Sequence, residues 1–473
     1  MELFKIQKPF IFTIFGASGD LAKLKIFPAM YRLAEQHRLP SEYYIVGYAR
    51  TDKSQDDFRK EFSASVKKDV GKDLNPKLLK DLIKHVFYFT GQYDQKKSFT
   101  EYRKYLKDLS GKTTYPHITY FSVPPVAFRP ILKNLSETRK TKKEDIRLVI
   151  EKPFGEDSES AEQLFHFISQ HFKKEQIYLL DHYLGKSAVQ SILFLRHANR
   201  ILNLLLRGSQ IANIQITAAE KVGVEDRVSY FDQVGIIKDM VQSHLLQVLS
   251  LITMSIPIQD SAASLQREKN SIISALKFQD ADCCVSLGQY ESYKKLRDVP
   301  QNSKTETFAA IKLFIDQQYW YKVPIYIRTG KKLDGKHTFI AIEFKKYDFQ
   351  KKEEEPNVLV IELYPEEKVT IKLLNKNYFG ASNYQAITTS RSIACSGDDC
   401  LPEHGLLLLE VIRGRKLNFL SFPEILASWK IADEIQAHIK KRKVKVEKYK
   451  DNSPGPASQH ALPEKDGFKW HCC

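Results

Sequence analysis

The chain has 473 residues, a mass of 54.7 kDa, a formal net charge of +16 and an isoelectric point near 9.2. Its composition, 42% hydrophobic and 27% charged, excludes a disordered chain. No apolar run reaches the roughly 18 residues that span a bilayer, so we expect neither a membrane segment nor a signal peptide. Single cores stop growing near about 250 to 300 residues, which predicts two domains.

The positive charge favours anionic partners, such as phosphorylated metabolites and cofactors, nucleic acids or acidic membranes. The densest basic run, Lys440 to Lys443, leads into the alternation Val444 to Glu447, which is typical of a solvated helix end or strand. No nucleic-acid motif accompanies it, so we expect no nucleic acid and no membrane as partners. The cysteines contain no C-x-x-C and are too sparse for a disulfide scaffold, which favours a reducing cytoplasm. They are Cys283, Cys284, Cys395, Cys400, Cys472 and Cys473.

In the first 180 residues, short apolar runs alternate with polar helical segments, a pattern that predicts a parallel α/β sheet. The expected strands are Phe10 to Phe15, Tyr43 to Tyr48, Val86 to Thr90, His117 to Ser122, Arg147 to Glu151 and Ile177 to Leu180.

Beyond residue 200, long helical stretches such as Gly235 to Met254 mix with alternating strands, which predicts an α+β domain with a mainly antiparallel sheet. The expected strands here are Ile211 to Ala218, Phe339 to Phe344, Val358 to Leu363 and Lys368 to Leu373. We therefore predict a Rossmann-type dinucleotide-binding domain over residues 1–181. A larger α+β domain for substrate binding and oligomerisation is expected over residues 182–473.

A glycine-rich turn follows the first predicted strand and opens a helix that runs to about Glu35. Backbone amides at such a helix start face the ligand, and the missing side chains let a pyrophosphate approach closely. We predict that the turn and the lysine after it bind a dinucleotide, although the motif alone also fits an ordinary strand-to-helix turn. The residues are Gly16, Ala17, Ser18, Gly19, Asp20, Leu21, Ala22 and Lys23.

The second strand ends in Ala49, Arg50 and Thr51, where an enzyme specific for NAD would place an acidic residue on the ribose hydroxyl. A guanidinium at this position holds a 2′-phosphate through charge-assisted hydrogen bonds. We therefore predict NADP as the cofactor. Asp52, an acidic residue close by, favours NAD instead. The alternative is that Arg50 is a loop cation that does not contact the cofactor.

Three further segments carry polar residues that a structural core would not select. E-K-P-F-G (Glu151 to Gly155) and D-H-Y-L-G-K (Asp181 to Lys186) each follow a predicted strand, at the sheet edge where ligands bind. Tyr230 to Gly235 precedes a helix that carries Asp239 and His244. Taken singly, each also fits an ordinary turn or a structural histidine.

Together these motifs resemble the glucose-6-phosphate dehydrogenase family. The similarity runs from about Phe10 to Trp429 and includes the pattern F-D-x-x-G-I-I-x-D-x-x-Q-x-H-L-L-Q (Phe231 to Gln247). The resemblance implies a cytoplasmic, NADP-dependent oxidation of glucose 6-phosphate at C1 to 6-phosphogluconolactone. This is the first step of the oxidative pentose phosphate pathway.

Oxidation of the C1 hydroxyl requires loss of its proton while hydride leaves for the nicotinamide. The resemblance assigns the base to His244 and the carboxylate that orients it to Asp181. The residues it assigns to the 6-phosphate are His182, Tyr183 and Lys186, and those it assigns to sugar hydroxyls are Glu220 and Asp239.

Further roles also follow only from the resemblance. Lys152 would lie between cofactor and sugar, and Pro153 matches a proline that is cis in the family. Lys331, in the R-x-G-K-x-L pattern, and Lys336 would be additional substrate contacts. No metal is implied, because hydride transfer with a histidine base needs none and no residue cluster has ligand spacing. The family assembles through the large sheet, so a homodimer or homotetramer is expected.

The sequence departs from animal members of the family at several positions. Tyr364 replaces a glutamine near the substrate, Phe128 replaces a tyrosine near the cofactor, and residues 402–410 lose a Tyr-Glu-Arg run. Animal enzymes also bind a second, structural NADP, whose site retains Arg328 and Lys372 here. Its other positions have changed to Glu362, His337, Ala341 and Thr370, and we predict that the structural NADP is absent.

Two other functions compete with this interpretation. Another Rossmann sugar oxidoreductase, of the glucose-fructose oxidoreductase type, would share the E-K-P turn but not D-H-Y-L-G-K. The second is a non-catalytic NADP-binding protein of the same fold. The departures at Tyr364 and residues 402–410 favour it, whereas the retained Asp181, His244 and Lys186 argue against it.

Overall fold

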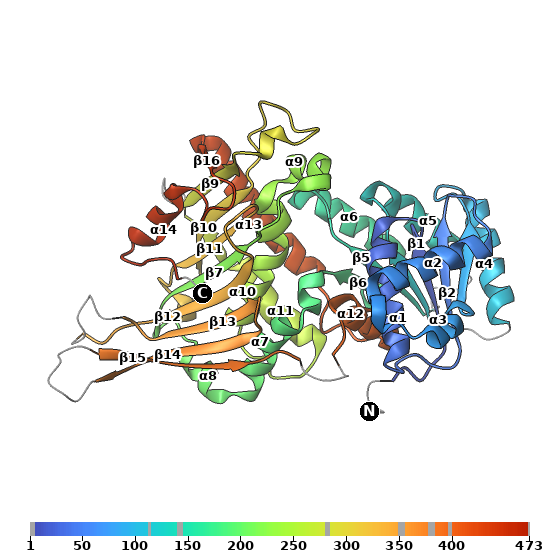
Figure 1. Ribbon diagram of the computed structural model, residues 1–473, viewed down its shortest axis with the longest axis horizontal. Helices are drawn as coiled ribbons and strands as arrows, with labels where there is room; N and C mark the ends of the chain where they lie inside the picture. The colour runs from blue at the N-terminus through green and yellow to red at the C-terminus, as the bar shows by residue number, and fades with distance from the viewer. Residues whose placement is uncertain are drawn as a thin grey trace. The chain divides into compact units, whose positions relative to one another are not determined.

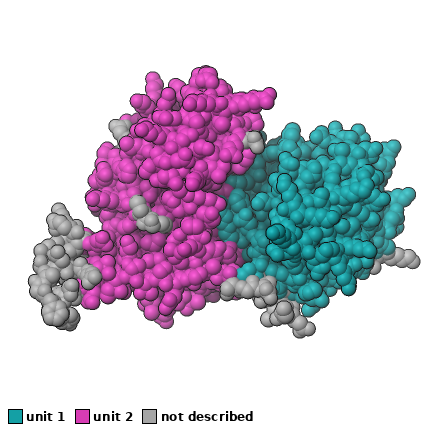
Figure 2. All heavy atoms as spheres, viewed as in Figure 1, with its two compact units in different colours: residues 1–186, 396–422 teal, residues 187–395, 423–473 magenta. Residues whose placement is uncertain are grey.

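The computed structural model of the chain separates into two compact units, coloured in Figure 2. It describes residues 5–111, 115–139, 145–279, 284–348, 355–376, 384–395 and 400–471. Unit 1 comprises Met1–Lys186 and Ser396–Phe422, and unit 2 comprises Ser187–Cys395 and Pro423–Cys473. The sequence had predicted one division after residue 181, without any signal that residues 396–422 pack with the first unit.

Unit 1 is built on a parallel sheet with the strand order β3-β2-β1-β4-β5-β6 (Figure 1). This order is that of a doubly wound nucleotide-binding sheet, so the predicted Rossmann-type fold is confirmed. Its strands are β1 Phe10–Phe15, β2 Tyr43–Ala49, β3 Val86–Thr90, β4 His117–Phe121, β5 Ile146–Glu151 and β6 Ile177–Leu180.

Helices on both faces explain why the strands of this sheet are continuously apolar. All six residues of β1, FIFTIF, are buried, as expected for a strand covered on two sides. One helix group contains α1, α2, α3 and α12, and the other contains α4, α5 and α6. The helices are η2 Ala22–Ile26, α1 Phe27–Glu35, α2 Gln55–Val70, α3 Pro76–Ile83, α4 Lys96–Ser110, α5 Phe128–Thr138, α6 Ser158–His171 and α12 Glu403–Arg413.

Unit 2 contains a larger sheet with the order β15-β14-β13-β12-β7-β11-β10-β9-β16, and β8 pairs with β10. Among the described strands of this sheet, only the pairs β7–β11 and β9–β16 are parallel, so the predicted mainly antiparallel α+β domain is confirmed. The strands are β7 Ile211–Ala219, β8 Leu276–Phe278, β9 Val285–Tyr290, β10 Phe308–Ile315, β11 Ile325–Gly330, β12 His337–Phe344, β13 Val358–Tyr364, β14 Lys368–Lys376, β15 Tyr384–Ser392 and β16 Val446–Tyr449.

The predicted helix from Gly235 to Met254 is present, but it is divided into segments of different winding. Tyr230 to Gly235 precede the helix that carries Asp239 and His244, as expected, but they are themselves helical. They lie in α9, which is kinked at Gly235, where φ is 71° and ψ is 171°. Such a positive φ is easily adopted only by glycine, which explains the break. The helices are α7 Ser187–Ala198, α8 Arg200–Leu205, α9 Val228–Ile236, the π-helix η8 Ile237–Leu245, α10 Leu246–Thr253, α11 Ala262–Ser274, α13 Phe422–Arg442 and α14 Ala461–Glu464.

Other sequence expectations concern surface and cysteine chemistry. The basic run ends helix α13 and β16 follows it, as predicted. Among the described helices, none combines the length and apolar character needed to cross a membrane. Cys395 and Cys400 are disulfide-bonded, which the low cysteine density did not indicate. Cys283, Cys472 and Cys473 lie outside the described residues.

Candidate active site

The predicted nucleotide turn lies where the strand order of the unit 1 sheet reverses, between β1 and β4. The Gly16 amide donates to the Tyr48 carbonyl at 2.9 Å, and the Gly19 amide donates to the Gly16 carbonyl at 2.9 Å. Gly16 has φ +82°, and a Cβ there would overlap the carbonyl oxygen of Ser122 on the neighbouring strand end. Because the backbones approach so closely, only glycine fits, and the turn leaves its amides at the ligand-binding edge of the sheet.

Some of the other residues of the turn are buried against the sheet and others are exposed to solvent. Ala17 and Ala22 are fully buried, which anchors the turn on the sheet. Ser18 and Leu21 are half-buried, and Asp20 is exposed. The ammonium of Lys23 lies 3.7 Å from the carboxylate of Glu61 on α2. The predicted cofactor residues are thus contiguous with the helix start.

Arg50 is exposed at the end of β2, one strand away from the turn. Its guanidinium carbon lies 5.5 Å from the ring centroid of Tyr93, which supports its planar face. Asp52, the residue that argued for NAD, accepts a hydrogen bond from the Thr90 hydroxyl at 3.5 Å.

The segment from Asp181 to Lys186 forms a tight turn after β6. Asp181 caps the 3-10 helix η6 (His182–Gly185), because its Oδ1 accepts from the Tyr183 amide at 3.0 Å. Its side chain is 1% exposed. The Lys186 ammonium lies 3.5 Å from the centroid of the Tyr183 ring. The structure thus brings together the three residues expected to bind phosphate.

A histidine that sequence reasoning missed lies beside this turn. The ring of His404, on α12, is nearly parallel to that of His182, with centroids 6.5 Å apart. Its Nε2 is 3.6 Å from a carboxylate oxygen of Glu151, which also accepts from the Tyr120 hydroxyl. A Cβ at Gly185 would lie 2.7 Å from the Glu403 carbonyl, so glycine permits the close packing of α12. His404 lies in the segment 402–410, which departs from the animal members in sequence. The sequence did not show that this segment lies beside the turn after β6.

The Glu151 motif also contains the predicted Lys152. Lys152 is half-buried at the end of β5, and the Lys152–Pro153 peptide bond is cis, as the resemblance implied. It follows β5 directly, so it lies at the same edge of the sheet as the glycine-rich turn.

In unit 2, the predicted sugar-binding residues form one charge cluster, in which Lys331 and Asp239 are buried and Glu220 is partly exposed. The Lys331 ammonium pairs with the carboxylate of Glu220 and lies 3.6 Å from that of Asp239. Arg227 approaches Asp239 from outside at 4.0 Å. Asp239 is 6% exposed and His244, on the same π-helix, is 1% exposed. Carboxylates and an ammonium held in this way can accept from and donate to the hydroxyls of a sugar.

Backbone hydrogen bonds fix this cluster on the sheet. The Glu220 amide donates to the Gly330 carbonyl at 2.9 Å, and the Lys331 amide donates to the Thr307 carbonyl at 2.9 Å. The Tyr449 hydroxyl donates to the Lys331 carbonyl at 2.6 Å. Two cluster residues therefore follow directly from the ends of the parallel pair β7 and β11.

Lys336 and Tyr364 also meet in unit 2. The Lys336 ammonium lies 4.1 Å from the centroid of the exposed Tyr364 ring. The tyrosine that departs from the animal family is thus a partner of a predicted substrate lysine. It supports the ammonium through its π-face.

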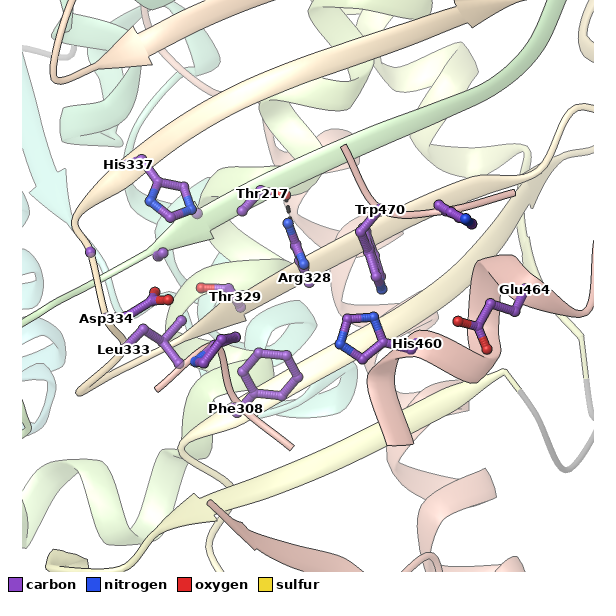
Figure 3. A pocket seen from close by; sticks show the side chains of 15 residues that line it. Thr217, Phe308, Arg328, Thr329, Leu333, Asp334, His337, His460, Glu464 and Trp470 are labelled. Carbon is purple, nitrogen blue, oxygen red and sulfur yellow. Dashed lines mark hydrogen bonds between the residues drawn. The ribbon is translucent and has the colours of Figure 1, made fainter. Parts of the chain in front are cut away.

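A separate pocket of about 670 Å³ opens on the unit 2 sheet (Figure 3). Arg328 lies between Thr217 and Trp470: it donates to the Thr217 hydroxyl at 2.9 Å, and its guanidinium carbon is 4.4 Å from the Trp470 ring. It also donates to the His471 carbonyl at 3.0 Å. Burial and the charge of Arg328 lower the pKa of His337, which keeps this ring neutral.

Comparison with known proteins places the chain in a family. Residues 13–191 match the model of the glucose-6-phosphate dehydrogenase NAD binding domain, and residues 193–471 match that of its C-terminal domain. The chain belongs to the glucose-6-phosphate dehydrogenase family. Members of this family are oxidoreductases, and the first domain model identifies a nicotinamide dinucleotide as the cofactor class.

Relatives of this family align over nearly the whole chain. Glucose-6-phosphate 1-dehydrogenase of Bacillus subtilis is 34% identical, covering 98% of each chain. Glucose-6-phosphate 1-dehydrogenase 5, cytoplasmic, of Arabidopsis thaliana is 36% identical over 96% of this chain and 91% of its own. A solved glucose-6-phosphate dehydrogenase in complex with glucose 6-phosphate superposes with a TM-score of 0.90 at 29% identity, covering 99% of both chains. The enzyme of Mycobacterium avium gives 0.86 at 29%, covering 98% of both.

We predict that the protein binds one NADP per chain, without the structural NADP of animal members. Arg328 already donates to protein acceptors and packs on Trp470, and Glu362, buried on β13, places a carboxylate paired with Lys368 at 3.2 Å where animal members have a different residue. A second polyanion at this site would have to displace these contacts. Calorimetric titration of the purified protein with NADP should give a stoichiometry near one. Two sites per chain, of which Arg328→Ala removes one, would contradict the prediction.

Proposed function

We propose that this protein oxidises glucose 6-phosphate at C1 to 6-phosphogluconolactone, with NADP as hydride acceptor. The observation that carries the proposal is the cluster of buried Lys331 and Asp239 with the partly exposed Glu220, on and beside the helix of His244. Burying Lys331 and Asp239 costs free energy, and a ligand rich in hydroxyl groups would supply hydrogen bonds to them and to Glu220.

The reaction divides into loss of a proton and loss of a hydride. His244 takes the proton of the C1 hydroxyl, and the nicotinamide supplies the hydride acceptor when the cofactor is bound. As the C1–H bond breaks, the oxygen forms the carbonyl of the lactone. Asp181 is proposed to hold the imidazole of His244 in the accepting tautomer and to stabilise its protonated form.

The phosphate of the substrate is assigned to the turn after β6. His182 and Tyr183 donate hydrogen bonds, and Lys186 adds a cation next to the Tyr183 ring. A dianion is stabilised most by charged donors, so this set favours a phosphorylated sugar over a free one. Lys152 at the end of β5 and Lys336 on the Tyr364 ring complete the proposed substrate contacts.

The preference for NADP rests on Arg50 at the end of β2, beside the glycine-rich turn. Its exposed guanidinium can grip a 2′-phosphate in a forked geometry, while the Tyr93 ring limits its motion. We further propose a cytoplasmic location, in keeping with relatives that carry this designation.

We propose that the protein forms a homo-oligomer through the unit 2 sheet, because the edge strands of this sheet expose apolar side chains. Ile371, Leu373 and Ile387 on β14 and β15 are 38%, 52% and 48% exposed, and Leu373 pairs directly with Ile387. Contiguous apolar groups on an edge hairpin mark a contact surface. Sedimentation should therefore give at least a dimer, and Leu373→Glu should shift it towards the monomer. A monomeric wild type would overturn this proposal.

The two alternatives differ from the proposal in measurable ways. A sugar oxidoreductase of another type would turn over free glucose as well as glucose 6-phosphate. A non-catalytic protein would bind NADP but produce no NADPH. Gal80p of Saccharomyces cerevisiae, a neighbour at 11% identity and a TM-score of 0.55, shares the fold alone and supports neither.

We predict that mixing the protein with NADP and glucose 6-phosphate produces NADPH absorbance, and that His244→Asn removes about 10²-fold or more of kcat, as expected for loss of a general base. The buried side chain is replaced by a smaller amide, so binding of both ligands should persist. Calorimetry of the variant checks this. Full turnover by His244→Asn would show that another group accepts the proton.

We predict that Arg50→Ala lowers kcat/KM for NADP by about 10- to 100-fold and leaves the value for NAD nearly unchanged, because charge-assisted hydrogen bonds to the 2′-phosphate are lost. Arg129→Ala is a matched control, since Arg129 is also exposed and packs on a ring, that of Phe167 at 5.3 Å. An unchanged NADP to NAD ratio in Arg50→Ala would contradict the assignment.

A further inference from the structure

The helix that carries Asp239 and His244 begins against a single acidic residue, Glu306, which comes just before β10. The Ile236 amide donates to the Glu306 backbone carbonyl at 3.1 Å. The next amide, of Ile237, donates to the Glu306 side-chain oxygen Oε1 at 3.5 Å. The first amides of a helix have no partner within it, so this residue satisfies two of them from another element.

The chain makes room for this carboxylate at the kink. A Cβ at Gly235 would overlap Oε1 of Glu306 and would lie 2.7 Å and 2.9 Å from its carboxyl carbon and second oxygen. The positive φ of Gly235 independently requires glycine. The kink therefore admits the Glu306 side chain to the helix start, and any larger residue would exclude it.

The carboxylate is held from other directions as well. The Gln436 side chain of α13 hydrogen-bonds to it, and the charge of Lys238, on η8, acts on it. The Glu306 side chain is half-buried. Through these contacts it connects the segment before β10 with the start of η8 and with the long helix α13.

The chain on either side of this carboxylate fixes the rest of the substrate cluster. The Thr307 carbonyl accepts from the Lys331 amide at 2.9 Å. The Ser303 and Thr305 hydroxyls donate to the side chain and backbone carbonyl of Asp232 on α9, each at 2.6 Å. One short segment thus contacts both the lysine of the cluster and α9, the helix that comes just before η8.

We propose that Glu306 is a positioning residue, which fixes the start of η8 so that Asp239 and His244 are held in register with Lys331. This inference rests on the proposed function, because it gives these residues their roles in the reaction. Asp239 follows Ile237 by two residues, so a shift of the helix start moves it relative to the Lys331 ammonium, now 3.6 Å away. Small displacements of this kind lower catalytic rates strongly.

The surroundings of Glu306 also shift its pKa. Burial raises its pKa to about 7, and the bonds from the protein amides, Gln436 and the charge of Lys238 oppose this rise. Burial raises the pKa of Tyr293, and the hydrogen bond that its hydroxyl donates to Asp232 and the nearby charge of Glu306 add to this rise. Since its folded pKa lies above the ordinary 4.5, the stability that Glu306 contributes falls as pH rises from about 4.5 to 7. A neutral glutamine would avoid this cost.

The test compares Glu306→Ala, Glu306→Asp and Glu306→Gln by kcat, KM and thermal unfolding. We expect kcat of Glu306→Ala to fall about 10-fold or more with KM for NADP unchanged, since the hydrogen bond to the start of η8 is lost while the glycine-rich turn of unit 1 is not altered. Glu306→Asp keeps the charge but is one methylene shorter, so it should lose activity in the same way. Glu306→Gln keeps the side-chain length and the acceptor oxygen, so it should retain most of kcat where Glu306→Ala and Glu306→Asp do not.

Gly235→Ala supplies a second, independent variant. Its Cβ would displace the carboxylate, so kcat should fall as in Glu306→Ala, and the double variant should be no worse than either single one. Glu447→Ala is the matched control, because this carboxylate also accepts from the first amides of a helix, that of Ser458 at 3.2 Å, away from the cluster. It should leave kcat unchanged.

The outcomes separate this inference from the proposed function. Wild-type turnover that is lost in His244→Asn, with full kcat per folded molecule in Glu306→Ala, would overturn the role of Glu306 alone. Additive losses in the Gly235 and Glu306 double variant would overturn it as well. Absence of wild-type turnover would overturn the proposed function. Glucose 6-phosphate affinity, measured by calorimetry, then still tests Glu306: unchanged affinity in Glu306→Ala refutes the positioning of Asp239, and weakened affinity supports it.

Discussion

The ion cluster of Lys331 with Glu220 and Asp239 is the interaction on which the arrangement of unit 2 depends. It joins the ends of β7 and β11 to the π-helix η8, and Lys331 and Asp239 lose most of their contact with water while Glu220 stays partly exposed. Such a cluster is stable only while every charge has a partner, since one uncompensated buried charge costs several kcal/mol. The surrounding backbone hydrogen bonds supply that geometry.

Close approach of backbones plays the corresponding part in unit 1. At Gly16 a strand end and a turn come so near that no side chain fits, which leaves amides at the edge of the sheet for a pyrophosphate. The same device returns at Gly185, against α12, and at Gly235, against Glu306. In each case a missing Cβ lets a distant segment reach a residue of the proposed chemistry.

The sequence was most informative where local pattern and chemistry coincide. Six apolar runs predicted the six strands of the unit 1 sheet, and Gly16 to Ala22 predicted the turn that follows the first of them. Parallel strands covered on both faces are continuously apolar, so such runs are easy to find. The motifs around Asp181 and His244 indicated the family, which the domain models confirmed.

What the sequence by itself determined was therefore the fold class, the family and the residues of each proposed site. Only the tertiary structure decided which of them meet: that Lys331 lies between Glu220 and Asp239, that His404 faces His182, and that Glu306 reaches the start of η8. It also assigned residues 396–422 to unit 1. These contacts join residues far apart in the chain, and neither periodicity nor spacing carries that information, because the packing of side chains around whole elements sets it.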